Sequence, residues 1–234
     1  MERTEATAWI SNSADERMDK LTIARIIAKY EIKATIFDFD GILVDTENVG
    51  MEVTKRIMME KFGIALNEEE VGYLYGLVYS EFYSEMVKKY KLDVDVQALV
   101  DHQDKRYEAE LGRFKECMPG ALEILEFLRQ HGIPTGICSG SRRVHVGKLV
   151  ENLGISKYFK IIITVEDSNQ HKPNAKPYFL AAKKLKISPK KCLVFEDSEH
   201  GVKAAKSAGM IVVGVKIGSQ GRQNLGKADI VVNT

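Results

Sequence analysis

Two aspartates one residue apart, Asp38 and Asp40, are the residues of this chain best suited by type and spacing to do chemistry. They follow the apolar residues Ile36 and Phe37, and Gly41 comes directly after them. This pattern predicts a buried strand with two carboxylates at its carboxyl end, which is where open α/β sheets bind their ligands. Two carboxylates this close repel each other unless a cation or a shared proton compensates their charge. Mg²⁺ is the leading candidate, because hard cations prefer oxygen ligands.

Polar residues also follow three other apolar, strand-like runs. In a parallel sheet the carboxyl ends of all strands share one edge, so we expect these groups to meet in one pocket. Such a set suits phosphoryl transfer, in which a carboxylate attacks phosphorus and Mg²⁺ neutralises phosphate charge. A hydroxyl, backbone N–H groups and a lysine would bind the phosphoryl oxygens. The residues are Ser139, Gly140, Ser141 and Arg142 after the second run, Lys172 and Pro173 after the third, and Glu196, Asp197 and Ser198 after the fourth.

Short apolar runs alternate with helical segments from Lys33 onward. Near-continuous apolar strands separated by helices predict a parallel sheet that is covered on both faces. The predicted fold class is therefore α/β, a Rossmann-like parallel sheet core with helices on both faces and an inserted all-α cap domain. The predicted strands are 34–39, 135–139, 161–165, 192–195, 211–215 and 230–232, and the predicted helices between them are 120–131, 142–153, 177–186 and 200–208.

Residues 47–112 break this alternation, because they contain no convincing strand and many aromatic residues. We expect a helical cap there, with helices at 48–62, 67–75, 80–91 and 95–111. Since this cap would leave the sheet directly after the two aspartates, it is expected to act as a lid over them. The predicted domains are an N-terminal extension at 1–31, a Rossmann-like catalytic core formed by 32–46 and 115–234, and the helical cap at 47–114.

The N-terminal extension contains one amphipathic helix, predicted at 14–30. Its apolar residues Leu21, Ala24, Ile27 and Ala28 recur at helical spacing and are expected to form the buried face. We expect this helix to pack on the main domain, and binding of a partner is the alternative.

The composition is that of an ordinary globular protein of 234 residues with a formal net charge of +1. This balance gives no sign of a polyanionic partner such as nucleic acid.

The three cysteines form no disulfide or zinc pattern, and Cys138 and Cys192 are expected to be small buried hydrophobes. No apolar run reaches the length of a membrane span, and the acidic N-terminal residues argue against a signal peptide. A cytoplasmic setting is therefore predicted, and the oligomeric state is not.

Four segments of the sequence resemble the four motifs of the haloacid dehalogenase superfamily, in the phosphatase and phosphomutase branch that includes β-phosphoglucomutase-like proteins. The resemblance extends from about residue 33 to the C-terminus and is generic over the lid. It implies a Mg²⁺-dependent phosphatase that hydrolyses a small phosphorylated metabolite through an aspartyl-phosphate intermediate. The segments are DFDGILVDTE (38–47), ICSGS (137–141), HKPNAKPYFLAAKKL (171–185) and LVFEDSEHGVKAAKSAGM (193–210).

The same resemblance implies a role for each residue by position. Asp38 would be the nucleophile, and Asp40 would be the general acid and base. Mg²⁺ would be held by Asp38, the backbone carbonyl of Asp40 and Asp197, with Glu196 as a ligand or as a partner behind the ligands. The predicted catalytic residues are Asp38, Asp40, Ser139 and Lys172, the predicted substrate-binding residues are Ser139, Gly140, Arg142 and Lys172, and the predicted metal residues are Asp38, Asp40, Glu196 and Asp197.

The sequence is also compatible with two alternative functions. A sugar phosphomutase needs a second phosphate site, which Arg142 or Arg143 would supply, although both fit equally well as a solvated first turn of a helix. Mutases of this type usually present an arginine from the first lid loop, but residues 68–83 contain no Arg or Lys, which weakens that alternative. The other alternative is a binding or regulatory protein without turnover, with 14–30 as its docking helix.

Two expectations concern the predicted lid itself. Residues Asp45, Thr46 and Glu47 are expected to cap its first helix, because Asp and Thr are common capping residues. The aromatic run is expected to form the packed interior of the lid rather than a stacking surface. Its members are Tyr73, Tyr75, Tyr79, Phe82 and Tyr83.

Overall fold

A computed structural model describes residues 19–74, 79–112, 115–217 and 224–233. Within these residues six strands form one sheet in the order β3-β2-β1-β4-β5-β6, and every neighbouring pair is parallel. The predicted parallel α/β fold class is therefore confirmed. The strands are β1 (Ala34–Phe37), β2 (Thr135–Cys138), β3 (Phe159–Ile163), β4 (Cys192–Glu196), β5 (Ile211–Lys216) and β6 (Ile230–Asn233).

The central strands β1 and β4 are buried along their whole length, as their apolar sequences require. Phe37 pairs with Phe195 in the register of the two strands, and their rings stack with centroids 4.6 Å apart. Because Asp38 and Glu196 are the next residues along each strand, this pairing sets their relative height. The Asp38 backbone N–H donates to the Phe195 carbonyl at 2.9 Å and extends the ladder past the last residue of β1.

The chain divides into two compact units. The first holds the described residues up to Asp38, residues 119–140 and residues 158–233, and it contains the sheet. The second holds residues 39–118 and 141–157. The second unit is therefore larger than the predicted cap at 47–114, since it also takes in 39–46, 115–118 and the helix that follows β2.

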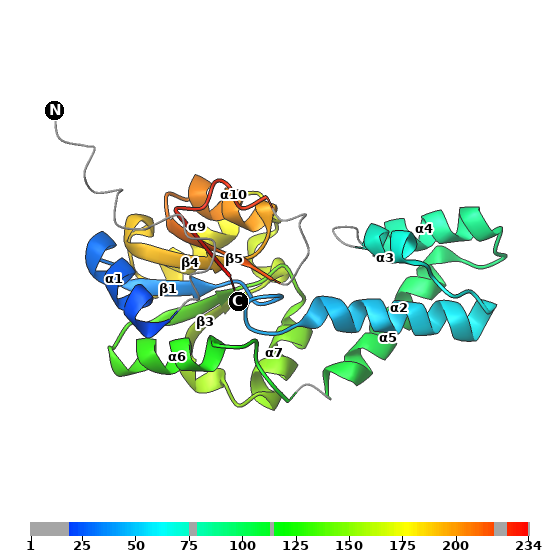
Figure 1. Ribbon diagram of the computed structural model, residues 1–234, viewed down its shortest axis with the longest axis horizontal. Coiled ribbons are helices and arrows are strands. Elements are labelled where there is room, and N and C mark those ends of the chain that lie inside the picture. Colours follow the sequence, from blue (N-terminus) through cyan, green and yellow to red (C-terminus); the bar gives the residue numbers. More distant parts are fainter. Residues whose placement is uncertain (1–18, 75–78, 113–114, 218–223, 234) are drawn as a thin grey trace. The chain divides into compact units, whose positions relative to one another are not determined.

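Helices of the first unit cover both faces of its sheet (Figure 1). On one face, α9 (Lys176–Leu185) and α10 (Glu199–Ser207) pack over the strands, and Tyr178, Ala182 and Val202 join the buried cluster with Ile36 and Val194. On the other face, α6 (Ala121–Gln130) contacts β2 and also α1 (Lys20–Tyr30). A short helix, α8 (Val165–Ser168), follows β3, and the 3-10 turns η1 (Ser156–Tyr158) and η2 (Pro189–Lys191) precede β3 and β4.

The N-terminal helix differs from its prediction. It begins at Lys20, after Asp19, whose side chain accepts a hydrogen bond from the Thr22 backbone N–H at 2.7 Å. The predicted buried face is wrong, because Ile23 and Ile26 are the buried residues, Leu21 and Ala28 are exposed, and Ala24 and Ile27 are half-buried. Both sets of residues satisfy helical spacing, and the two branched isoleucines offer more apolar surface to bury than the alanines.

The second unit contains the helices predicted for the cap. Residues Met51, Ile57, Phe82, Tyr83 and Leu99 lie in its buried core, so Phe82 and Tyr83 pack inside as expected. Tyr79 packs partly buried against the same core, Tyr75 lies outside the described residues, and the side chain of Tyr73 is not described. The helices are α2 (Thr46–Phe62), α3 (Glu68–Leu74), α4 (Tyr79–Tyr90), α5 (Val96–Leu111) and α7 (Arg143–Asn152).

A buried amide connects three elements of this second unit. Gln103 donates to the Gly50 carbonyl at 3.1 Å, and its Oε1 accepts hydrogen bonds from Tyr83 at 2.9 Å and Thr54 at 3.2 Å. Helix α7 joins the unit through α5, because Asn152 donates to the Leu111 carbonyl at 3.1 Å. A core with satisfied polar groups of this kind favours one defined packing of the helices.

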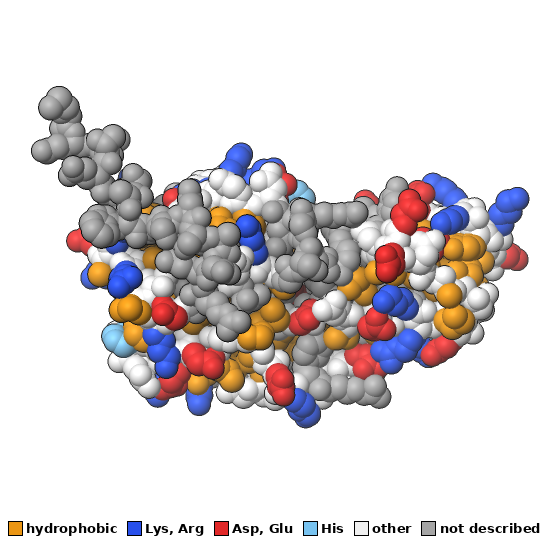
Figure 2. All heavy atoms as spheres, in the orientation of Figure 1, with side chains coloured by type: hydrophobic (Ala, Val, Ile, Leu, Met, Phe, Trp, Pro, Cys, Tyr) orange, Lys and Arg blue, Asp and Glu red, His pale blue; other side chains and the backbone are white. Residues whose placement is uncertain are grey.

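Acidic and basic side chains are interspersed over the face that Figure 2 shows, in agreement with the formal net charge of +1. Within the described residues, each helix is too short or too polar to span a bilayer.

Candidate active site

Three carboxylates meet at the carboxyl ends of β1 and β4. Asp38, Glu196 and Asp197 each offer one ligand atom, and these atoms all lie within 4.8 Å of one another. All three residues are buried. Carboxylates gathered this closely need positive charge nearby, and oxygen donors of this kind suit a hard cation such as Mg²⁺.

One of the required positive charges comes from Lys172. Its Nζ lies 2.5 Å from Asp38 Oδ1 and 2.6 Å from Glu196 Oε1, and its side chain is 12% exposed. Burial alone would lower the pKa of this ammonium, but the charges of Asp38 and Glu196 outweigh it and hold the pKa well above its ordinary value. Lys172 is therefore a fixed cation.

Glu196 has both carboxylate oxygens occupied by donors of the protein. Oε1 accepts from Lys172 and from the Tyr178 hydroxyl at 2.7 Å. Oε2 accepts from the Ser198 hydroxyl at 3.0 Å and from the backbone N–H groups of Asp197 and Ser198, both at 3.2 Å. The side chain is fully buried. Glu196 thus serves as an internal anchor for its neighbours.

The start of α10 makes room for the buried carboxylate of Glu196. Ser198 is the N-cap residue, and its Oγ accepts a hydrogen bond from the Gly201 backbone N–H at 3.0 Å. A Cβ atom on Gly201 would lie 1.7 to 2.1 Å from the three carboxylate atoms of Glu196. Only glycine leaves room for the buried carboxylate at this point of the helix.

The predicted phosphate-binding residues follow β2, which is the strand next to β1. Ser139 is buried, and its backbone N–H donates to the Ile163 carbonyl of β3 at 2.9 Å. Gly140 is exposed. Both therefore lie at the same sheet edge as Asp38, because β1, β2 and β3 run parallel.

Asp40 belongs to the second unit, where two hydroxyls hold its carboxylate. Thr46 donates to Oδ1 at 2.5 Å and Ser141 donates to Oδ2 at 2.7 Å. The turn before Thr46 is closed by a hydrogen bond of 2.7 Å from the Gly41 N–H to the Val44 carbonyl, with Gly41 at φ 79°. Glycine adopts this left-handed conformation without strain. The carboxylate of Asp40 is thus held at both oxygens.

The expectation that residues 45–47 cap α2 is wrong for Asp45 and Thr46, and the side chain of Glu47 is not among those that the structure describes. Asp45 occupies the N-cap position, but its side chain makes no capping hydrogen bond and instead accepts one from Asn48 at 2.6 Å. Thr46 directs its hydroxyl to Asp40. The carboxylate competes successfully for this donor because it bears a charge.

Tyr107 of α5 stands near this second carboxylate. Burial raises the pKa of its phenol far above the ordinary value, and the charges of Asp40 and Tyr79 add to the increase, while the Thr46 hydroxyl works against it. The phenol therefore stays neutral at physiological pH. Its ring packs edge-on against His145 with centroids 5.5 Å apart.

Arg142, one of the predicted substrate-binding residues, is the N-cap residue of α7 and is exposed. Its Nη1 lies 3.3 Å from Asp104 Oδ2 of α5, so its charge already has an acidic partner within the second unit. His145, one turn further on, similarly lies 3.2 Å from Glu108 through Nε2.

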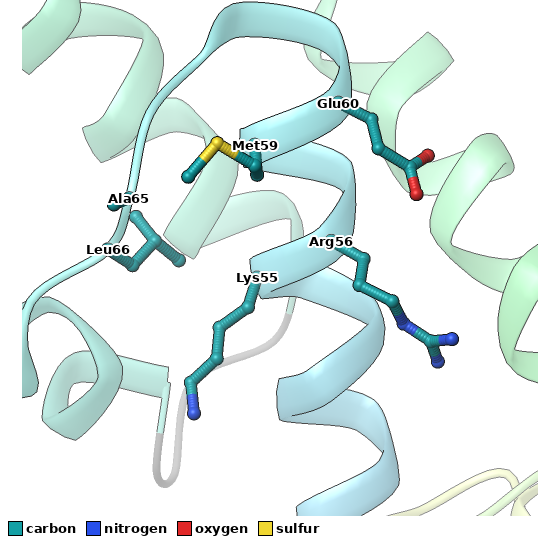
Figure 3. Close-up of a pocket in the computed structure, with 6 residues that line it drawn as sticks. All are labelled: Lys55, Arg56, Met59, Glu60, Ala65 and Leu66. Atoms are coloured by element: carbon teal, nitrogen blue, oxygen red, sulfur yellow. The ribbon is translucent and has the colours of Figure 1, made fainter.

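A cavity of about 340 Å³ lies on α2 and the segment that follows it (Figure 3). Its two cations already have acidic partners, since Lys55 pairs with Glu52 at 2.7 Å and Arg56 pairs with Glu110 at 3.0 Å. The cavity contains none of the residues predicted to act on phosphate. Its lining residues are Lys55, Arg56, Met59, Glu60, Ala65 and Leu66.

The structure thus brings together Asp38, Lys172, Glu196 and Asp197, and it places Asp40 with Ser141 in the second unit. Sequence reasoning missed Tyr178, which resembled any buried aromatic residue of a helix. It also assigned no role to Gly201, although the sequence shows that this glycine closely follows Glu196 and Asp197.

Comparisons with known proteins agree with this geometry. Residues 35–215 match the family described as haloacid dehalogenase-like hydrolase. The chain is 30% identical over 183 residues to the phosphorylated carbohydrates phosphatase of Thermotoga maritima. The aligned region covers 76% of this chain and 82% of that protein. It is 31% identical over 209 residues to the β-phosphoglucomutase of Bacillus subtilis, covering 86% and 89%.

One solved structure shows the same arrangement of elements. A haloacid dehalogenase family hydrolase from Deinococcus radiodurans, solved with bound phosphate and sodium, superposes with a TM-score of 0.75 at 25% identity. The match covers 87% of this chain and 91% of that one. On its sequence, its fold and the acidic cluster beside Lys172, this chain belongs to the haloacid dehalogenase-like hydrolase family, in the branch of phosphatases and β-phosphoglucomutase-like proteins.

Proposed function

We propose that this hydrolase is a Mg²⁺-dependent phosphatase that acts on a small phosphomonoester through an aspartyl-phosphate on Asp38. The observation that carries the proposal is the position of the Lys172 ammonium, 2.5 Å from Asp38 within a cluster of three carboxylates. A nucleophilic carboxylate must approach an anionic phosphate, and an adjacent fixed cation lowers the repulsion between them.

Asp38 and Asp197, with the backbone carbonyl of Asp40, are the groups that would hold Mg²⁺. Glu196 is better suited to orient Lys172 than to bind the ion directly, because both of its oxygens already accept hydrogen bonds. When bound, the ion would neutralise charge on the phosphate and on the carboxylates.

In the first step an Asp38 oxygen forms a bond to phosphorus, and the bond from phosphorus to the alcohol oxygen breaks. Asp40 gives its proton to the departing alcohol oxygen. In the second step a water oxygen attacks the same phosphorus while Asp40 takes a proton from it, and the bond to Asp38 breaks. The products are the alcohol and inorganic phosphate. Asp40 follows Asp38 by two residues, so the backbone keeps their Cα atoms within about 7 Å of each other.

Thr46 and Ser141 support this assignment of Asp40 as the acid and base. Each donates to one oxygen of the carboxylate, so together they fix the orientation of the Asp40 side chain. Ser139 and the exposed backbone at Gly140, at the end of the neighbouring strand, are the groups that we assign to the phosphoryl oxygens. These groups support a phosphomonoester as the class of substrate.

The test is a phosphate-release screen over sugar phosphates, nucleotides, cofactor phosphates and phosphoglycolate, each with Mg²⁺ and with EDTA. We expect release that depends on Mg²⁺ and that is lost in Asp38→Asn. Asp101→Asn is the matched control, because Asp101 is an exposed residue of α5 and should keep full activity. If no phosphomonoester is hydrolysed in the presence of Mg²⁺, the protein has no turnover and a regulatory role replaces the proposal.

A phosphomutase activity is the second candidate, favoured by the similarity to the β-phosphoglucomutase of Bacillus subtilis. The acidic partner of Arg142 argues against it, since a second phosphate would have to displace Asp104. Product analysis with a sugar 1-phosphate separates the two activities. Isomerised sugar phosphate without free phosphate would establish a mutase.

We also propose a reducing, cytoplasmic compartment for this protein. Its support is that Cys117, Cys138 and Cys192 are all free thiols, which is typical of proteins in a reducing compartment.

A further inference from the structure

Tyr178 lies at the point where the hydrophobic core meets the acidic cluster. It is fully buried on α9, among Ala34, Ile36 and Val194 of the sheet. A phenylalanine would fill the same apolar space without a polar atom to satisfy. The hydroxyl therefore has a cost in this environment unless it makes a hydrogen bond.

The hydroxyl of Tyr178 donates to Glu196 Oε1 at 2.7 Å, and this oxygen also accepts from Lys172 at 2.6 Å. The ring of Tyr178 lies beneath the same ammonium, with Nζ 5.2 Å from the ring centroid. Tyr178 thus touches both Lys172, which pairs with Asp38, and Glu196, which holds the other side of Lys172. Burial, together with the charge of Glu196, raises the pKa of this phenol well above its ordinary value, so the proton that it donates is always present.

We propose that Tyr178 is a positioning residue for phosphoryl transfer, which acts by holding Glu196 and, through it, the Lys172 ammonium against Asp38. This inference rests on the function proposed above. Glu196 is held at Oε2 by Ser198 and by two backbone N–H groups, and at Oε1 by Tyr178 and Lys172. Without the phenol, Oε1 would rely on Lys172 alone, and the ammonium would be drawn away from Asp38 toward the buried carboxylate.

The variant that isolates this hydrogen bond is Tyr178→Phe, because it keeps the ring under Lys172 and removes one oxygen atom. Groups that orient the residues of a metal site typically contribute 10-fold to 100-fold to activity or affinity. We therefore expect kcat to fall about 10-fold to 100-fold. KM should change little, because the ammonium stabilises charge in the transferring phosphoryl group more than in the bound substrate.

The matched control is Tyr83→Phe in the second unit. Tyr83 is also fully buried on a helix, and its hydroxyl donates to Gln103 Oε1 at 2.9 Å, far along the chain from the acidic cluster. This variant makes the same chemical change and loses one buried hydrogen bond. It is expected to reduce the stability of the protein and to leave kcat unchanged.

A second measurement does not require turnover. Isothermal titration with Mg²⁺ and orthovanadate, an analogue of the transferring group, reports whether Asp38, Lys172 and Asp197 still form one site. We expect binding about 10-fold weaker in Tyr178→Phe and unchanged binding in Tyr83→Phe.

The outcomes separate this inference from the proposed function. Unchanged kcat and unchanged vanadate binding in Tyr178→Phe would overturn the positioning role and leave the phosphatase assignment intact. Equal losses in both tyrosine variants would also overturn it, because a general loss of stability would then explain the result. If the wild-type protein hydrolyses no phosphomonoester but vanadate binding still weakens only in Tyr178→Phe, Tyr178 still positions Glu196 and Lys172, and the proposed phosphatase function fails.

Discussion

The Lys172 ammonium lies 2.5 Å from Asp38 Oδ1, although 134 residues separate the two in the sequence. Glu196 holds the other side of the same ammonium at 2.6 Å. The pair therefore depends on three segments of the chain, and its removal has consequences for stability as well as for activity.

Lys172→Met should leave Asp38 and Glu196 as uncompensated buried carboxylates. Removing one partner of a buried ion pair typically costs about 3–5 kcal/mol of unfolding free energy, and we expect a loss near the lower limit because the site is not fully sealed. Urea denaturation followed by circular dichroism measures the loss. Saturating Mg²⁺ should recover part of it, because the ion supplies positive charge. A loss that is the same with and without Mg²⁺ would contradict a metal site at these carboxylates.

Gly201→Ala should destabilise the protein by about 1–3 kcal/mol, because its Cβ would overlap the Glu196 carboxylate. The same variant should lose phosphatase activity, since Glu196 orients Lys172. Gly147→Ala is the control on α7, where an added Cβ would meet no atom within 4 Å. There we expect a gain of about 0.5–1 kcal/mol from the better helix former. Equal stability of the two variants in urea would contradict the crowding at Gly201.

Thr46→Val should lower kcat about 10-fold to 100-fold, because a hydrogen bond to a charged group contributes about 1.5–3 kcal/mol and Asp40 would lose one. Thr46→Ser keeps the hydroxyl and should restore most of the rate. Thr54→Val makes the same change further along α2, where the hydroxyl contacts Gln103 and the Gly50 carbonyl. It should affect stability alone. Steady-state phosphate release with all three variants decides whether the Thr46 hydroxyl acts on Asp40.

Glu70→Gln should change the acid stability of the second unit. Burial alone would raise the pKa of the Glu70 carboxyl, but hydrogen bonds from Lys89 and Tyr90 and from the Asn67 backbone hold it below its ordinary value of 4.5. A group with a lowered pKa in the folded state stabilises the protein above about pH 4.5, and this contribution is lost as the pH falls through the folded-state pKa.

The variant should therefore lose about 1–3 kcal/mol at pH 7, since it leaves charged partners unsatisfied, and its stability should fall less steeply in acid. Urea titrations between pH 7 and pH 3 measure both effects. Glu85→Gln serves as the control, because Glu85 is exposed and pairs with Lys88 at the surface. An unchanged acid slope in Glu70→Gln would show that this carboxyl does not control acid stability.

The strand ends of the site could be predicted because each signal is local in the sequence. Asp38, Ser139 and Glu196 each follow or end an apolar run, and one rule places all carboxyl ends of a parallel sheet on the same edge. The fold class followed from the same alternation of apolar runs and helices. These predictions needed no knowledge of how the helices pack.

The contribution of Tyr178 could not be predicted, because its sequence neighbours describe only the buried face of a helix. The direction of its hydroxyl depends on how α9 packs against β2 and β3, which no local pattern records. Thr46 was misjudged for a related reason. A threonine at the start of a helix fits a cap, and only the folded turn from Gly41 to Val44 brings Asp40 close enough to take its hydroxyl instead.

The wide separation of Asp38 from its partners also affects biosynthesis. Asp38 leaves the ribosome when Lys172, Glu196 and Asp197 have yet to be translated, so its carboxylate first exists as a solvated group on a nascent chain. The strand β1 gains its neighbour β4 only after most of the polypeptide has been made. A chain that ends before Cys192 therefore lacks β4, Glu196 and Asp197, and it cannot carry the activity proposed for this protein.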